Sequence, residues 1–448
     1  MARKQDIIDD HQHYRKNSLT LWGAVSMGAG VMIGAGIFAL TGQVAEFAGA
    51  LFPLAFVVAA IISSFAAYTY IKMSNAYPSA GGIAMVLSKA YGRSTLTGGC
   101  ALLMAFSMII NESLVARTFG TYVLRLFDVG SHRLLVPALA LALIIAAFLI
   151  NIAGNRVIGG VSKVAAVLKI GGIAVFAIAA LWVSGVDYEA VSAPTATKGV
   201  SAGGFLAGVA LAILAYKGFT TITNSGGEVV NPHKNVGRAI LISLAICFVV
   251  YILVALAVGS SLSIDQIIAA KNYSLAEAAR PAFGSLGVQF TVLIAVIATG
   301  SGLLASMFAV SRMLVMLTEM RLIPHSHLGL SGENIQHHLL VYTAAVASLL
   351  AVFFDLSRIA SLGAIFYLVM DIAIHWGVFR RLRREIGAHA SVLIVAIVLD
   401  AVVLSAFLIV KFRADPVIIL IATIGIATIF AFEKIYISRT PATPEMAS

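Results

Sequence analysis

Long apolar segments recur along the whole chain and limit what it can fold into. A helix needs about 20 apolar residues to cross ~30 Å of hydrocarbon. In lipid a lone segment must also satisfy its own backbone hydrogen bonds, which an α-helix does. The sequence therefore predicts about twelve transmembrane helices, at residues 18–47, 51–75, 95–127, 134–152, 158–184, 202–230, 237–261, 286–320, 339–354, 356–379, 390–411 and 416–437. The ninth is short and only residues 355–358 separate it from the tenth, so eleven spans is the alternative.

The composition excludes a water-soluble fold. Charged residues make up 11% of the chain, against roughly 25% in soluble domains, and hydrophobic residues make up 60%. The formal net charge is +10, but the basic residues lie in short loops between apolar segments, so we expect no nucleic-acid partner. Cys100 and Cys247 both fall inside apolar segments, which predicts neither a disulfide nor a metal site. The sequence contains no phosphate-binding loop or other enzyme motif, so we expect neither ATP drive, nor a cofactor, nor catalysis.

The distribution of lysine and arginine predicts the orientation. If residues 1–17 lie in the cytoplasm, more than twice as many basic residues fall in cytoplasmic loops as in outside loops. The positive-inside rule then places residues 438–448 in the cytoplasm as well. No short apolar stretch with a cleavage site follows the polar start, so we expect no removable signal peptide. The expected location is the inner or plasma membrane.

Two of the expected helices carry an interruption. The first contains four glycines within nine residues, each costing up to about 1 kcal/mol in a helix interior: Gly28, Gly30, Gly34 and Gly36. Small-residue packing between helices is the alternative interpretation. The sixth contains Gly218 directly after Lys217, followed by threonines and an asparagine. Interruptions at matching places in two halves favour a transporter built from inverted repeats. The broken ends expose backbone N–H and C=O groups, which together suit a zwitterion.

Four short motifs resemble those of the amino acid–polyamine–organocation transporter family. Residues 34–38 (GAGIF) are similar to the break in its first helix, and residues 77–82 (YPSAGG) to the loop after its second helix. The remaining two motifs are similar to its sixth helix and to the end of its eighth helix: Gly218, Phe219, Glu228, Asn231, Pro232 and Arg238, then Ser311, Arg312, Ile323 and Pro324. All four occur in the family's order between residues 30 and 324.

The resemblance implies an all-α fold with two inverted five-helix repeats. These would be residues 18–184 and residues 202–384, with two peripheral helices in residues 390–437. It also implies transport of amino acids or related amines by alternating access. The substrate carboxylate would meet N–H groups of Ala35, Gly36 and Ile37. The substrate ammonium would meet carbonyls of the two broken helices, and the full expected site is Met32, Ile33, Gly34, Ala35, Gly36, Ile37, Leu214, Tyr216, Lys217, Gly218 and Phe219.

Lys169 in the fifth helix is the expected coupling residue. In proton-coupled members of the family, a lysine at the matching position replaces a sodium ion against carbonyls of helix one, here those of Gly30 and Ile33. Low-dielectric surroundings disfavour a charged amine, so a buried lysine can exchange a proton near neutral pH. The alternative is a lysine that snorkels to the cytoplasm. The sequence thus predicts a proton-coupled importer, most simply of neutral amino acids.

Three other functions remain open at this point. An exchanger of amino acids or amines would use Lys169 only structurally. A channel or a non-transporting sensor belongs to a different class, although the short cytoplasmic loops offer no signalling domain. The sequence identifies neither the amino acid nor the oligomeric state.

Lys217 departs from the family pattern, which has a small or apolar residue there. Its charge would repel a substrate ammonium, so three roles are open: selection of a substrate with an extra carboxylate, pairing with Glu112, or proton handling. Leu214 lacks the aromatic ring frequent at the family's helix-six gate, which suggests a looser gate.

Other ionisable residues within spans also need an explanation, because each costs roughly 2.5–3.5 kcal/mol to insert. Glu112 and Arg117 are expected to neutralise each other or neighbouring groups. Asp371 and His375, four residues apart, share a helix face and form either a structural pair or a proton relay. Asp400 is expected to be structural. The loop histidines have no acidic or cysteine neighbours, so no metal site is expected at His325, His327, His337 and His338.

Overall fold

The computed structural model describes residues 17–79, 81–127, 134–153, 155–185, 200–323 and 333–440. Regular structure in these residues is helical, apart from one isolated parallel bridge between Leu19 and Val229. The tails at 1–16 and 441–448, with Pro324, His325 and His327, lie outside the described residues. The all-α, multi-pass class that the sequence predicts is confirmed.

The helices follow the expected segments closely. The first half comprises α2 (Leu21–Met32), α3 (Ala35–Ala48), η2 (Gly49–Leu51), α4 (Phe52–Ala76), α5 (Gly82–Tyr91), α6 (Thr95–Arg125), α7 (Leu135–Ala153) and α8 (Asn155–Ser184). The second half comprises α10 (Ala202–Tyr216), η3 (Lys217–Phe219), α11 (Thr220–Asn224), η4 (Gly226–Glu228), α12 (Pro232–Ser261), α13 (Ile264–Ala269), α14 (Ser274–Ala278), α15 (Arg280–Glu319), α16 (Glu333–Phe353), α17 (Leu356–Gly377) and η5 (Val378–Leu382). Two further helices complete the chain, α18 (Ala390–Ala414) and α19 (Pro416–Arg439).

Ten helical stretches among the described residues are long and apolar enough to span a membrane. The expected spans that fall short are the first and the ninth, where the apolar helices are Leu21–Met32 and His337–Phe353. The first is short because the chain leaves the helical conformation after Met32, so that α2 and α3 share one expected span. The count of twelve therefore stays a prediction.

Local sequence explains where several helices begin. Proline fixes its own φ and lacks an N–H, which makes it suitable for a first helical turn, and α4, α12 and α19 each carry one there. The hydroxyl of Ser94 accepts a hydrogen bond from the N–H of Thr97 and caps α6. Asp415 lies in the turn before α19 and accepts a hydrogen bond from the Arg358 guanidinium of α17 at 2.7 Å. This hydrogen bond and the charges of Arg358 and Lys411 hold the pKa of the Asp415 carboxyl below its usual value.

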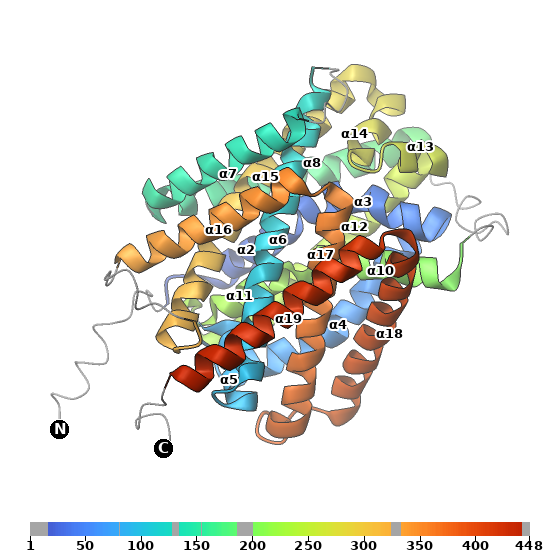
Figure 1. Ribbon diagram of the computed structural model, residues 1–448. Coiled ribbons are helices and arrows are strands. Elements are labelled where there is room, and N and C mark those ends of the chain that lie inside the picture. The colour runs from blue at the N-terminus through green and yellow to red at the C-terminus, as the bar shows by residue number, and fades with distance from the viewer. Residues whose placement is uncertain are drawn as a thin grey trace.

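Two helices lie at the centre of the bundle, and others face outward. The most apolar windows of α6 and α10 are 89% buried, whereas those of α7 and α19 are only 22% buried. α10 packs on α3 and α4, while α6 packs on α15 and α17. In Figure 1, α7 and α16 lie side by side on one flank and α18 and α19 on another. Exposed apolar side chains on these outer helices, such as Leu149, Phe353 and Leu420, suit contact with lipid.

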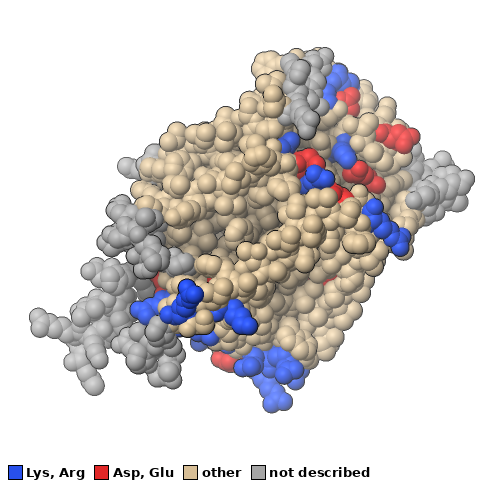
Figure 2. Space-filling view, viewed as in Figure 1, with Lys and Arg blue, Asp and Glu red and all other residues tan. Residues whose placement is uncertain are grey.

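Charged side chains gather near the two ends of the molecule. Figure 2 shows a broad band without exposed charge between them. Such a band matches the hydrocarbon layer of a bilayer, where a charge is costly. The central helices α6 and α10 therefore cross the part of the molecule that is furthest from water.

Candidate substrate and coupling site

The first helix of the expected bundle is interrupted near its middle, as predicted. α2 ends at Met32, and Ile33 (φ −82°, ψ 69°) and Gly34 (φ −146°, ψ −122°) leave the helical conformation before α3 begins at Ala35. Gly34 is the N-cap of α3 and offers no side chain to its first N–H groups. A helix N-terminus of this kind attracts a carboxylate, through free N–H groups and the helix dipole.

The sixth helix is also irregular, but it is not unwound. α10 passes at Tyr216 into the 3-10 turn η3 and then into α11. Lys217 (φ −63°, ψ −12°) and its neighbours keep right-handed helical angles, so the backbone tightens instead of opening. The Thr220 hydroxyl donates to the Lys217 carbonyl at 2.9 Å, and the backbone N–H of Thr220 donates to the same carbonyl. The expected unwound segment is thus a tightened turn.

Glycine brings the two interruptions into contact. A Cβ at Gly218 would lie 2.9 Å from the backbone nitrogen of Met32, closer than real Cβ contacts allow. A Cβ at Gly36 would lie 3.1 Å from Cα of Ala215. Each helix therefore uses a glycine where the backbone of the other passes.

Tyr251 of α12 bridges both interruptions and was not predicted. Its hydroxyl lies 2.6 Å from the Met32 carbonyl and 3.1 Å from the Ala215 carbonyl. Its one proton can be donated to either of these acceptors, both at ends of broken helices. The only sequence signal was a tyrosine inside the apolar segment 237–261.

A cavity of about 20 Å³ lies between the interruptions. Four of the expected substrate residues line it: Gly36, Leu214, Lys217 and Gly218. Seven residues that sequence reasoning missed line it too: Val31, Met108, Asn111, Ala215, Thr220, Thr221 and Ser306. Asn111 and Ser306 bring polar side chains from α6 and α15 to a wall that also carries Lys217 and two threonines.

The other expected substrate residues lie near this cavity without lining it. The Tyr216 hydroxyl points to the Phe56 carbonyl at 3.4 Å. The Phe219 ring packs edge-on against Tyr70, with ring centres 5.3 Å apart. Backbone groups of Met32, Ile33, Gly34, Ala35 and Ile37 form the break itself. Their roles in substrate binding stay predictions.

Lys169 reaches the first interruption from α8. Its ammonium donates to the Gly30 carbonyl at 2.5 Å and to the Ser301 hydroxyl of α15 at 3.3 Å. The side chain is buried, so the alternative of a lysine snorkelling to the surface is wrong. Of the two expected carbonyls, the ammonium contacts that of Gly30, while Ser301 takes the place expected for Ile33.

Lys217 turns away from Glu112, the partner proposed for it. Its ammonium donates to the carbonyl and the hydroxyl oxygen of Ser107, at 2.9 and 2.8 Å. It also lies 5.7 Å from the ring centre of Tyr367, a cation–π distance. Among the described residues its partners are thus a serine and a tyrosine, so Lys217 fixes α10 to α6 and α17.

Glu112 and Arg117 do not neutralise each other, because five residues of helix place them about 140° apart around the axis. Arg117 donates to the carbonyls of Ala351 and Phe354 at 2.7 and 2.6 Å and so caps the end of α16. Glu112 is fully buried and accepts a 3.3 Å hydrogen bond from the cavity residue Ser306. Its second carboxyl oxygen has no hydrogen-bond partner among the described residues.

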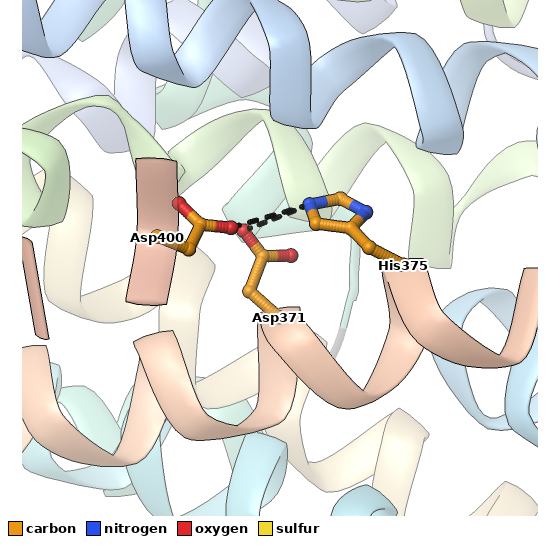
Figure 3. Close-up of side chains that lie close together, drawn as sticks. All are labelled: Asp371, His375 and Asp400. Atoms are coloured by element: carbon orange, nitrogen blue, oxygen red, sulfur yellow. Dashed lines mark ion pairs between the residues drawn. The ribbon is translucent and has the colours of Figure 1, made fainter. Parts of the chain in front are cut away.

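Asp371 and His375 share a face of α17 as predicted, and Asp400 of α18 joins them. The His375 Nε2 atom lies 3.5 Å from a carboxyl oxygen of each aspartate (Figure 3). Tyr70 of α4 donates a short hydrogen bond to Asp371. Sequence reasoning missed Asp400 here, since α18 lies outside the expected repeats and its register on α17 has no local signal.

Ion pairs lie on both sides of the cavity. Arg312 of α15 pairs with Glu228 of η4 near the Leu19–Val229 bridge. Towards the other end, Lys271 pairs with Glu46 of α3 at 2.7 Å. Charged pairs of this kind can open and close without moving a packed core.

Apolar spanning helices, two of them interrupted around a shared cavity, define a multi-pass membrane transporter. The family comparison makes this specific. The chain matches the amino acid permease model over residues 19–431 and belongs to that family.

Named relatives are transporters rather than enzymes. The chain is 29% identical to the inner membrane transport protein YbaT of Escherichia coli over 394 residues, which cover 87% of this chain and 89% of YbaT. It is 26% identical to the branched-chain amino acid permease BcaP of Lactococcus lactis, over 84% of each chain. It is 27% identical to the serine/threonine exchanger SteT of Bacillus subtilis, over 61% of each chain. These comparisons support amino acid transport.

Proposed function

We propose that this chain imports amino acids, neutral ones by preference, together with protons. The observation that carries the proposal is the contact between the Lys169 ammonium and the Gly30 carbonyl, beside the break in the first helix. A charged ammonium donates a strong hydrogen bond to a carbonyl. When Lys169 releases its proton, this bond loses its charge and α2 is held less firmly. Proton release is thereby linked to the shape of the substrate site.

The substrate would lie across the two interruptions. Its carboxylate would accept hydrogen bonds from the free N–H groups at the start of α3, at Ala35, Gly36 and Ile37. Its ammonium would take the carbonyls of Met32 and Ala215, where it displaces the Tyr251 hydroxyl. Leu214 and Gly218 would then contact the substrate side chain.

The cavity size supports alternating access. A volume of about 20 Å³ accommodates little more than one water molecule. An amino acid therefore enters only when the surrounding helices move apart. We propose that residues 18–184 and 202–384 form the two repeats that move, with residues 390–437 outside them. The Arg312–Glu228 and Lys271–Glu46 pairs would open in turn on the two sides.

We place the chain in the inner or plasma membrane with both termini in the cytoplasm. The excess of basic residues in the loops on that side supports this orientation. Energy would come from the proton gradient and the membrane potential, not from ATP.

Uptake into empty, sodium-free proteoliposomes tests the proposal. A panel of labelled amino acids is offered with an inward proton gradient. Accumulation that a protonophore collapses supports proton symport and identifies the substrate. If accumulation persists with the protonophore, or if no amino acid accumulates, proton symport is wrong.

Amino acid exchange is the second candidate, because one relative is named as a serine/threonine exchanger. In that case empty vesicles would take up little label. Vesicles preloaded with unlabelled amino acid would take it up rapidly. Lys169 would then be a structural lysine.

A further inference from the structure

The strongest unassigned feature is the cluster of Asp371, His375 and Asp400 between α17 and α18. All three side chains are fully buried. One ligand atom from each lies within 4.8 Å of the others. Figure 3 shows both carboxylates directed at the same ring nitrogen. We propose that these three residues bind a divalent transition-metal ion, for which Zn²⁺ is the test metal.

The spacing of the donor atoms suits an ion better than direct hydrogen bonds. Nε2 of His375 is 3.5 Å from Oδ2 of Asp371 and 3.5 Å from Oδ2 of Asp400. An N–H···O hydrogen bond is usually 2.7–3.2 Å long. Two ligands of a tetrahedral zinc, each about 2.1 Å from the metal, lie about 3.4 Å apart. The two separations from Nε2 match those of zinc ligands, and the two carboxyl oxygens lie within 4.8 Å of each other.

The cluster also contains buried atoms that have no hydrogen-bond partner in the part of the chain that the structure describes. These are Oδ2 of Asp371, both carboxyl oxygens of Asp400 and both ring nitrogens of His375. Buried polar atoms almost always have a partner in folded proteins. A metal ion would use one oxygen of each aspartate and one ring nitrogen.

Charge neutrality favours a divalent ion in this apolar environment. Two ionised aspartates carry −2, and a metal-binding imidazole is neutral. A divalent cation brings the sum to zero. The ligand set of one imidazole and two carboxylates is one that zinc accepts, and a water molecule would complete four-coordination.

Two neighbouring features resemble the surroundings of known metal sites. Tyr70 of α4 donates to Oδ1 of Asp371, which orients that carboxylate as an outer hydrogen bond does around metal ligands. The π-helix η5 begins three residues after His375, and such turns are frequent at functional sites. The metal would join α17 to α18, one turn along α17 from Tyr367, which contacts Lys217.

Zinc binding by the purified full-length chain, carrying no histidine tag, tests the proposal. The chain is stripped with a chelator and titrated with Zn²⁺ against a coloured zinc indicator. We expect one tightly bound Zn²⁺ per chain. Asp400→Asn and His375→Gln should abolish it, and Tyr70→Phe should weaken it about 10- to 100-fold. The matched control is His337→Gln with His338→Gln, which removes two histidines of the first turns of α16, in place of the expected loop, and should leave the bound zinc unchanged.

Several outcomes would overturn the proposal. One is absence of tight zinc in the unaltered chain; another is zinc that survives Asp400→Asn but disappears in the His337→Gln, His338→Gln control. A cluster that only stores protons would change stability with pH and bind no metal, which also rejects the proposal.

If Asp400→Asn does not fold, Co²⁺ in the unaltered chain gives the readout. Co²⁺ in a four-coordinate site would absorb visible light intensely. Absorption as weak as that of Co²⁺ in water would reject the site. Metal content needs no transport assay, so this proposal and proton symport can fail separately.

Discussion

The two interruptions around the cavity differ in what holds them. At the first, Ile33 and Gly34 leave the helical conformation, and a lysine from another helix, Lys169, holds the carbonyl of Gly30. At the second, the backbone stays helical and contains its own lysine, Lys217, which is tied to Ser107. The first break therefore depends on the charge of a distant side chain. The second is held by its own helical turns and by the contact between Lys217 and Ser107, so we expect it to form a rigid wall of the cavity.

This difference assigns separate tasks to two buried lysines. Lys169 contacts a backbone carbonyl beside the break, so we expect a change in its charge to alter the position of α2. Lys217 lines the cavity itself and so affects what the cavity accepts. We infer that coupling and selectivity are separable by mutation.

The largest expected effect is that of Lys169→Ala. A gradient of one pH unit stores about 1.4 kcal/mol, enough for roughly tenfold accumulation by a one-proton symporter. Without the titrating amine we expect the ratio of inside to outside amino acid concentration to fall to one. Exchange of outside label for unlabelled amino acid preloaded in the vesicles should continue. Labelled uptake in proteoliposomes measures both. The exposed Lys234→Ala is the control, and full accumulation by Lys169→Ala would remove the coupling role.

Lys217→Met tests selectivity. The substitution keeps a long side chain and removes the charge from the cavity, so cationic amino acids should compete better and acidic ones worse. We expect a change of about tenfold in competition constants, since a hydrogen bond to a charged group contributes about 1.5–3 kcal/mol. Competition against one labelled substrate measures this change. An unaltered competition profile would mean that the Ser107 anchor keeps the charge away from every substrate.

Gly218→Ala tests whether the two interruptions must touch. The new methyl group would overlap the backbone of Met32. Overpacking of this kind costs about 1–3 kcal/mol, so we expect a lower thermal stability and slower uptake. Gly171→Ala on α8 is the matched control, since a Cβ there meets nothing within 4 Å. Equal behaviour of the two variants would show that the helices can separate at no cost.

The sequence was informative where chemistry is local and less so where it depends on register. Apolar length alone predicted most spans; clustered glycines located the first interruption, and Gly218 with the polar residues after it located the second. The form of the second interruption was not predictable, because one glycine beside polar residues is compatible with a tightened turn as well as with an unwound segment. Partners across helices were missed as well. These contacts depend on how helices rotate against each other, which composition does not fix. They join Lys217 to Ser107, Lys169 to Ser301 and His375 to Asp400.

The smallest expected effect comes from Tyr251→Phe. This substitution tests both interruptions at once, because the Tyr251 hydroxyl contacts a carbonyl of each. The lost hydroxyl bridges the Met32 and Ala215 carbonyls, so stability should fall by about 0.5–1.5 kcal/mol. The same loss frees both carbonyls for a substrate ammonium, so KM should fall a few-fold. Thermal unfolding and initial uptake rates measure these opposite changes. Tyr122→Phe is the control, because its hydroxyl is also buried but donates to the Phe38 carbonyl of α3, at 3.1 Å. A rise in KM in Tyr251→Phe would mean that the hydroxyl itself binds the substrate.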